Sequence, residues 1–365
     1  MSAPDNAHRL PLLGASRAHT ELCGYCPKLC RPACPVSTVE GRESVTPWGK
    51  MRALGEWLGG ASEIAPRAQR AWACTGCLHC RELCLLDNPV ADTLSLGRAE
   101  ALAAGYAPPE VTAFLEDLPR RAERLEACAR RLGPGDADAA TAWVPGCTSV
   151  VRETDHAEEV SQGIRRLAVG ARVVADVCCG APLWDAGDRQ GFARQAERFA
   201  QRVQGRVRVV VGDPGCAYAL KVLYPRVGVA LPLVEHVSEL ALRERSRLSR
   251  RSDPEVPVYH DACKLGRGLG LFDAPRSVLE HLTGSAPDEL DENRSRANCS
   301  GGGALLPVTR GATADALGRS LAEAVIFRHG PGRVVVTACA SSRQRLRQAG
   351  VRAEDLSHWI ARGVR

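Results

Sequence analysis

Long apolar runs are missing from this 365-residue chain, and aromatic side chains make up only 4 % of it. No window approaches the roughly 18 consecutive apolar residues that a membrane-spanning helix needs. Residues 1–20 also lack the continuous apolar stretch of a secretory signal, so we expect a cytoplasmic protein. With so few aromatic residues, aliphatic side chains and alanine must fill the core.

Basic runs and nucleotide-binding glycine motifs are missing as well. The net charge is +6, but the arginines are scattered, so we interpret them as solvated surface and expect no nucleic-acid partner. No G-x-G-x-x-G fingerprint opens a strand–helix unit, and the glycines of 266–270 follow a cysteine motif without the required spacing. The sequence therefore gives no sign of a flavin or nicotinamide site of its own.

Cysteine is abundant, with 16 residues. Eight of them form the runs Cys23-x2-Cys26-x3-Cys30-x3-Cys34-Pro35 and Cys74-x2-Cys77-x2-Cys80-x3-Cys84. Cysteines this close in sequence cannot all form unstrained disulfides, but their thiolates can surround a metal cluster. In a cytosolic chain such abundance indicates metal binding or thiol chemistry. The spacing of the second run and the proline after the first follow the bacterial pattern for [4Fe–4S] clusters.

Two-cluster proteins of this kind use a crossed ligand set, because the fourth cysteine of each run binds the other cluster. That rule assigns Cys23, Cys26, Cys30 and Cys84 to set 1 and Cys74, Cys77, Cys80 and Cys34 to set 2. The first run departs from the usual spacing, with three residues instead of two between its second and third cysteines. The alternative is a pair of four-cysteine zinc sites, since zinc also accepts C-x2-C pairs.

The pattern of apolar residues changes along the chain. Up to residue 132 it indicates helices, including one that opens at Pro47 and one over 109–132 that Pro119 kinks. From residue 142, short apolar runs alternate with helical segments, which is typical of parallel sheets covered by helices. We predict an irregular tail (1–20), a helical ferredoxin-like domain (21–108), a connecting helix and linker (109–141), and two α/β lobes (142–240 and 256–365) joined by a linker (241–255).

Cysteines follow the predicted strands, and they do so twice. In the first lobe these are Cys147, Cys178, Cys179 and Cys216, and in the second they are Cys263, Cys299 and Cys339. The repeat indicates that the two lobes arose by duplication. Sites of open α/β sheets lie at the carboxyl ends of strands, where a helix N-terminus also stabilises a thiolate. We therefore predict a third redox centre at the first four residues, called set 3 below.

Taken together, these motifs resemble a family of iron–sulfur proteins with two CCG (cysteine-rich) domains. The resemblance covers residues 21–362 and rests on the two runs, Cys178-Cys179-Gly180, the segment His260–Arg267, Cys299-Ser300-Gly301-Gly302-Gly303, and Thr337-Ala338-Cys339. The family includes the catalytic subunit of heterodisulfide reductase and the iron–sulfur subunit of glycolate oxidase.

This resemblance implies an iron–sulfur oxidoreductase subunit with two [4Fe–4S] clusters and a further cysteine-bound centre. It also implies thiol/disulfide or 2-hydroxy acid chemistry. The expected partner is a flavoprotein dehydrogenase, an electron-transfer flavoprotein or a membrane cytochrome, and a membrane partner would hold the protein at the inner face of the membrane.

The best-equipped relatives carry one cysteine, an adjacent pair and a C-x2-C in each CCG domain, and these five hold a cluster that cleaves disulfides. Here Ala219 stands where the last cysteine of the first lobe is expected, while Asn298 and Ser342 replace two cysteines of the second. The second lobe is therefore a degenerate site that would need His260 or Asp261 as a ligand, or it is empty.

Two redox functions remain open at this point, beside a zinc-stabilised interaction protein, which only the altered spacing of the first run favours. One is an oxidoreductase subunit with its own catalytic centre, where Lys264 and Arg267, just after Cys263, would hold an anionic substrate. The other is a pure electron-relay subunit, which the missing cysteines favour.

Overall fold

The computed structural model describes residues 10–250 and 255–365, which fold into two compact units. Unit 1 contains the residues up to Asp117, Pro182–Gln190 and Asn298–Leu321, and unit 2 contains Leu118–Ala181, Gly191–Ala297 and Ala322–Arg365. The units interleave along the sequence, so the predicted division into consecutive ranges stays a prediction. Residues 251–254 of the predicted linker 241–255 lie outside the described residues.

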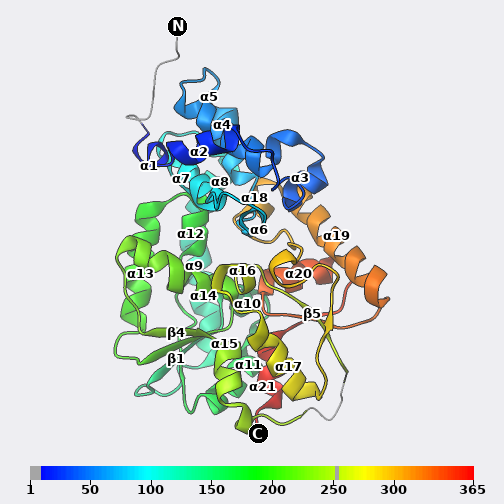
Figure 1. The fold of residues 1–365 in the computed structure, drawn as a ribbon. Helices are drawn as coiled ribbons and strands as arrows, with labels where there is room; N and C mark the ends of the chain where they lie inside the picture. Colours follow the sequence, from blue (N-terminus) through cyan, green and yellow to red (C-terminus); the bar gives the residue numbers. More distant parts are fainter. Residues whose placement is uncertain (1–9, 251–254) are drawn as a thin grey trace. The chain divides into compact units, whose positions relative to one another are not determined.

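The secondary structure of unit 1 is helical (Figure 1). Its helices are α1 (Pro11–Gly14), α2 (Arg17–Gly24), α3 (Pro35–Glu40), α4 (Pro47–Leu58), α5 (Ile64–Gln69), α6 (His79–Glu82), α7 (Val90–Ala103), α8 (Pro109–Glu116), most of α12 (Ala181–Ala186), α18 (Leu306–Thr309) and the first part of α19 (Gly311–His329). Met51, Leu54 and Trp57 of α4 pack in its core. Leu10 and Leu13 are buried in the same core, which explains why residues 11–20 are largely helical instead of irregular.

The start of α4 is tightly determined. Pro47 occupies its first turn, and the Thr46 side chain caps the helix by accepting a hydrogen bond from the Gly49 N–H at 3.0 Å. A Cβ atom on Gly49 would lie only 2.4 Å from the Glu43 carbonyl oxygen, so only glycine allows the preceding turn to pack here. These constraints orient the first turn of α4, which carries Lys50.

Unit 2 contains two four-stranded sheets in which every pairing is parallel (Figure 1). The first has the order β2-β1-β3-β4, with β1 (Thr141–Val144), β2 (Arg172–Val173), β3 (Arg208–Val211) and β4 (Leu233–His236). The second has the order β6-β5-β7-β8, with β5 (Val258–His260), β6 (Asp288–Glu289), β7 (Val335–Thr337) and β8 (Ala353–Asp355). The predicted combination of a helical ferredoxin-like part with parallel α/β sheets is therefore correct at this level.

Helices precede and follow the strands of unit 2. They are α9 (Leu118–Ala129), α10 (Cys147–Arg152), α11 (Thr154–Leu167), most of α13 (Arg189–Arg202), α14 (Pro214–Tyr218), α15 (Val237–Arg243), α16 (Gly266–Leu269), α17 (Asp273–Thr283), α20 (Ala340–Gln348) and α21 (Leu356–Gly363). Residues of both sheets share one hydrophobic core, in which Trp143 and Trp359 are almost fully buried. The predicted helix 109–132 is divided at Asp117, and Pro119 lies in the first turn of α9, where proline is tolerated.

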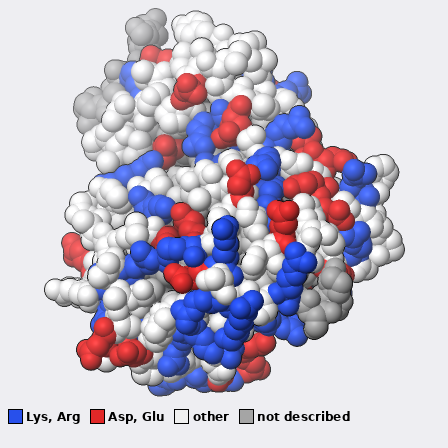
Figure 2. All heavy atoms as spheres, turned by 60° about the horizontal axis from the view of Figure 1, so that its bottom comes forward, with Lys and Arg blue, Asp and Glu red and all other residues white. Residues whose placement is uncertain are grey.

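Charged residues of both signs lie on the face drawn in Figure 2, and Lys and Arg gather near its lower centre. Many arginines form ion pairs, such as Arg347 with Glu153 at 2.9 Å and Arg352 with Glu255 at 3.0 Å. Pairs of this kind fit the interpretation of the positive charge as solvated surface. No helix in the described part of the chain is both long and apolar enough to cross a membrane.

The packing of α11 against α21 depends on Gly163. A Cβ atom there would lie 2.6 Å from Cβ and 2.8 Å from Cα of Ala361, so the two helices touch through their backbones. We expect Gly163→Ala to force the helices apart and to lower the free energy of unfolding by about 1–3 kcal/mol, although alanine favours helix. Denaturant unfolding followed by circular dichroism measures this change.

Gly311→Ala in α19 is the matched control, because nothing lies within 4 Å of a Cβ atom at Gly311. It should leave the unfolding midpoint unchanged or raise it slightly. Equal stability of Gly163→Ala and the natural protein would contradict the described helix contact.

Candidate metal centres

The structure brings the four cysteines of set 1 together. Cys23 lies at the end of α2, Cys26 and Cys30 lie in the loop that follows, and Cys84 lies just after α6. The Cys23 thiol interacts electrostatically with those of Cys30, Cys26 and Cys84. A residue of the second run is therefore among those of the first.

The four cysteines of set 2 also lie together, and here a residue of the first run joins three residues of the second. Cys34 precedes α3, while Cys74, Cys77 and Cys80 belong to the second run. The Cys80 thiol interacts with Cys74, Cys77 and Cys34, and all four line one pocket of unit 1. The ligand assignment itself stays a prediction, but the crossed arrangement that it requires is present.

Around both sets, the backbone directs N–H groups toward sulfur atoms. Lys28, Leu78 and Asp87 have left-handed backbone conformations with φ of +64°, +65° and +48°, which non-glycine residues seldom adopt. Such strain concentrates at functional sites. Backbone N–H groups point at the thiols, as from Lys28 to Cys26 Sγ at 3.4 Å and from Gly76 to Cys74 Sγ at 3.3 Å.

The charge balance of the sets fits a metal. Burial and the neighbouring Cys30 raise the pKa of the Cys23 thiol to about 12, and burial together with Cys26 raises the pKa of Cys30 to about 11. Thiols so close together resist ionisation unless a positive charge lies among them, and a bound metal deprotonates its thiol ligands outright. The donors therefore suit an iron–sulfur cluster or zinc, both of which bind thiolate.

Two side chains that the sequence motifs did not reveal also contact sulfur. The Asn88 amide donates to Cys23 Sγ at 3.1 Å in set 1. The Lys50 ammonium donates to Cys34 Sγ at 3.3 Å in set 2. Burial alone would lower the pKa of Lys50, but the thiolates of Cys34 and Cys74 outweigh burial and raise it.

Set 3 lies in unit 2, where strands of the first sheet end. Cys147 begins α10 after β1, Cys178 and Cys179 follow β2, and Cys216 lies in α14 after β3. The sulfur atoms of Cys147 and Cys178 are 3.9 Å apart. The structure thus brings these predicted residues to one edge of the sheet.

Neighbouring groups hold the set 3 backbone in place. The Tyr224 hydroxyl donates to the Cys179 carbonyl at 3.0 Å, and the Gln195 amide donates to the Cys178 carbonyl at 2.8 Å. Gly180, with φ of +78°, lets the chain turn directly after the pair.

Strand register changes how the two sheets correspond. Val144 of β1 pairs with Val211 of β3, and His260 of β5 pairs with Thr337 of β7. Counting three residues from the first member of each pair makes Cys147 equivalent to Cys263.

Counting from Val211 and Thr337, the second members of these pairs, corrects the alignment of the cysteine motifs. Two residues beyond Val211 and Thr337 lie Asp213 and Cys339, each at the N-cap of the next helix. Five residues beyond Val211 and Thr337 lie Cys216 and Ser342. Cys216 is therefore the last cysteine of its motif and Asp213 replaces the first, whereas the sequence interpretation had placed Ala219 at the last position.

Asp213 links the two sheets electrostatically. Its carboxylate accepts hydrogen bonds from the N–H groups of Gly215 at 2.8 Å and Cys216 at 3.2 Å. Burial raises the pKa of Asp213. Burial and Asp213 together raise the pKa of the Cys339 thiol to about 12.

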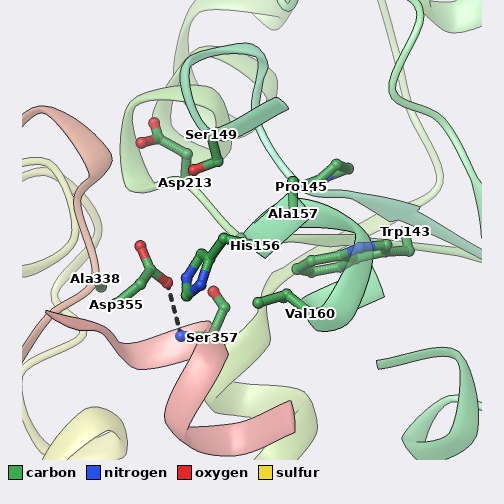
Figure 3. A pocket seen from close by; sticks show the side chains of 11 residues that line it. Trp143, Pro145, Ser149, His156, Ala157, Val160, Asp213, Ala338, Asp355 and Ser357 are labelled. Carbon is green, nitrogen blue, oxygen red and sulfur yellow. Dashed lines mark hydrogen bonds between the residues drawn. The ribbon is translucent and has the colours of Figure 1, made fainter. Parts of the chain in front are cut away.

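A pocket with polar and apolar walls adjoins Asp213 (Figure 3). Asp355 and His156 line it together with Ser149 and Ser357, and Asp355 accepts a hydrogen bond from the Ser357 N–H at 2.8 Å. Register makes Asp355 the counterpart of His236, because Val211 pairs with His236 and Thr337 with Asp355.

The predicted second-lobe cysteines are divided between the units. Cys263 and Cys339 lie in unit 2, while Cys299 lies in unit 1. Of the two alternative ligands, Asp261 pairs through both oxygens with Arg276 at 2.7 and 2.8 Å, and His260 contacts the Thr337 hydroxyl at 3.2 Å.

The two residues predicted to hold an anionic substrate have other contacts. The Lys264 ammonium lies 4.0 Å from the centre of the Tyr218 ring. Arg267 is buried and donates to the carbonyls of Ser295 and Ala297 at 2.9 and 2.8 Å. Their role toward a substrate stays a prediction.

Comparison with protein families agrees with the two kinds of site. Residues 19–87, which contain sets 1 and 2, match the 4Fe-4S dicluster domain. Residues 141–221 and 258–343, each covering the greater part of one sheet, match the cysteine-rich domain.

The chain is also similar to subunits of two known reductases. The chain is 31 % identical over 173 residues to one subunit of the dihydromethanophenazine:CoB–CoM heterodisulfide reductase of Methanosarcina mazei, covering 44 % of this chain and 42 % of the relative. It is 25 % identical over 310 residues to one subunit of the fumarate reductase (CoM/CoB) of Methanothermobacter marburgensis, covering 81 % of this chain and 62 % of the relative. The alignments thus span less than two thirds of either relative.

The gathered thiolates and both domain matches indicate that the chain binds iron–sulfur clusters. It belongs to the family of iron–sulfur oxidoreductases that carry cysteine-rich (CCG) domains.

Proposed function

We propose that this chain is an electron-carrying oxidoreductase subunit with two [4Fe–4S] clusters, one at set 1 and one at set 2. The exchange of Cys84 and Cys34 between the two runs carries the proposal. Two-cluster ferredoxins use this exchange, whereas zinc sites built from separate cysteine pairs do not need it. Each cluster would supply one-electron chemistry, and the cysteines, the backbone N–H groups, Asn88 and Lys50 would hold it and adjust its potential.

Set 3 would hold a further redox centre that exchanges electrons with those clusters. The 3.9 Å approach of Cys147 and Cys178 at the carboxyl ends of parallel strands supports this role. The alternative is a pure relay subunit with no catalytic centre of its own. Asp213, Asn298 and Ser342 favour it, because they stand where a fully equipped pair of lobes would have cysteines.

The same strand order in both sheets, together with the equivalence of Cys147 and Cys263, supports an origin of the lobes by duplication. From the family resemblance, we propose thiol/disulfide or 2-hydroxy acid chemistry for the complex in which this chain works, and the heterodisulfide reductase relative agrees with the first of these. A flavoprotein dehydrogenase, an electron-transfer flavoprotein or a membrane cytochrome would be its partner. The chain would be cytoplasmic, and a membrane partner would hold it at the inner face of the membrane.

Set 1 is the more exposed of the two sets. Cys26, Cys30 and Cys84 are only half-buried, and the side chains beside them include Tyr25, which is 92 % exposed, and Leu85, which is 84 % exposed. Electron tunnelling favours the shortest path, so we propose that the partner exchanges electrons at set 1.

The crossed ligand sets predict which variants share a defect. Cys84→Ala should remove the same paramagnetic signal as Cys26→Ala, and Cys34→Ala should remove the same signal as Cys77→Ala, because each pair would serve one cluster. Electron paramagnetic resonance of dithionite-reduced, anaerobically purified protein measures this. Were Cys84→Ala to share its lost signal with Cys77→Ala instead, the crossed assignment would be wrong.

The third centre predicts the iron content. Anaerobically purified protein should contain about twelve irons and as many acid-labile sulfides, against about eight for a relay. Cys178→Ala and Cys179→Ala should lower the content by about four irons while the signals of sets 1 and 2 persist.

Cys128→Ala is the matched control, because Cys128 lies on α9 outside every set. About eight irons in the natural protein, unchanged in the Cys178 and Cys179 variants, would identify the relay. Bound zinc without iron would contradict the redox function altogether.

A further inference from the structure

Lys50 places a positive charge inside the protein at set 2. Its side chain is 1 % exposed, and its ammonium lies 3.3 Å from Cys34 Sγ. It lines the same pocket as the four set 2 cysteines. Lysine is seldom buried this completely unless a negative group pairs with it.

The partners of this ammonium are sulfur atoms. Its strongest electrostatic interactions are with Cys34, Cys74 and Cys80. The Thr46 cap, the proline at the helix start and the tight contact of Gly49 orient the turn that carries it. The fold therefore aims a cation at the place where thiolates would bind a cluster.

Set 1 has a different electrostatic environment. Its side-chain donor is the neutral Asn88 amide, 3.1 Å from Cys23 Sγ. The nearby Lys28 is half-exposed, pairs with Glu43 at 3.1 Å and lies 3.9 Å from the centre of the Trp48 ring. Water and Glu43 screen that charge, whereas the charge of Lys50 is shielded from water.

A fixed positive charge favours the reduced form of a nearby cluster, because reduction adds negative charge. We propose that Lys50 makes set 2 the electron-accepting member of the pair. One electron would leave the cluster at set 1, which is oxidised, and reach the cluster at set 2, which is reduced; no bond breaks and no proton moves. This inference rests on the proposed function and assigns a direction within it.

The order of the two potentials in the natural protein is the first test. A potentiometric titration of the full chain, followed by paramagnetic resonance, gives a midpoint for each signal, and the Cys26→Ala and Cys77→Ala variants assign the signals to sets 1 and 2. We expect the set 2 signal to appear at the higher potential. The opposite order overturns the proposal, and protein without iron overturns the proposed function instead.

Three lysine variants give the second test. Lys50→Met should reduce the equilibrium constant for moving an electron from set 1 to set 2 at least tenfold, which is about 59 mV for a one-electron couple. Lys50→Arg keeps the charge and should stay within a few-fold of the natural value. Lys28→Met, the same substitution beside set 1, should change the constant less than Lys50→Met does.

Unchanged potentials in a Lys50→Met protein that contains both clusters would overturn the proposal. Should Lys50→Met fail to assemble the cluster at set 2, the order in the natural protein and the value for Lys50→Arg decide the question without it.

Discussion

Buried thiolates repel one another, and unit 1 is organised around the need to offset that repulsion. Each of its two sets gathers four sulfur atoms, some of them buried, and the raised pKa values of Cys23 and Cys30 express the resulting cost of ionisation. Only nearby positive charge or hydrogen-bond donors make such a group of thiolates stable. Backbone N–H groups, the Asn88 amide and the Lys50 ammonium provide part of that compensation, and a bound cluster would provide the rest.

The exchange of Cys34 and Cys84 makes the two sets mechanically dependent on each other. Because each set draws on both runs, the two runs cannot move apart without separating ligands of both sets. Metal binding in such a site contributes directly to folding. The left-handed backbone at Lys28 and Leu78 is then understandable, since the cluster contacts would hold conformations that the local sequence disfavours.

Sequence patterns predicted the parts of this fold that depend on local spacing. The cysteine runs are local motifs, and the central strands β1, β3, β5 and β7 are visible because strands covered on both faces are continuously apolar. The edge strands β4, β6 and β8 went unpredicted, because they are short and partly polar, as Asp288–Glu289 shows. Lys50 could not be predicted either, since the sequence of α4 does not say that a lysine would face sulfur.

The role of Asp213 also needed the structure. Alignment by cysteines alone places Cys216 opposite Cys339, whereas the pairing of β1 with β3 and of β5 with β7 places Asp213 there. Aligning the two motifs by their cysteines thus concealed that Asp213 stands where a cysteine is expected.

That correction changes the chemistry expected of unit 2. In the first lobe the group at this position is a half-buried carboxylate that caps α14, and in the second lobe it is a thiol whose ionisation that carboxylate opposes. A carboxylate held by two backbone N–H groups is poorly available to a metal, so the first lobe would rely on its four cysteines alone. Asp213 also raises the pKa values of the Cys147 and Cys216 thiols, so thiolates in either lobe would need a positive charge such as a bound metal. The two lobes therefore differ in their donors, because four cysteines follow strands of the first sheet, whereas the three of the second lobe are divided between the units.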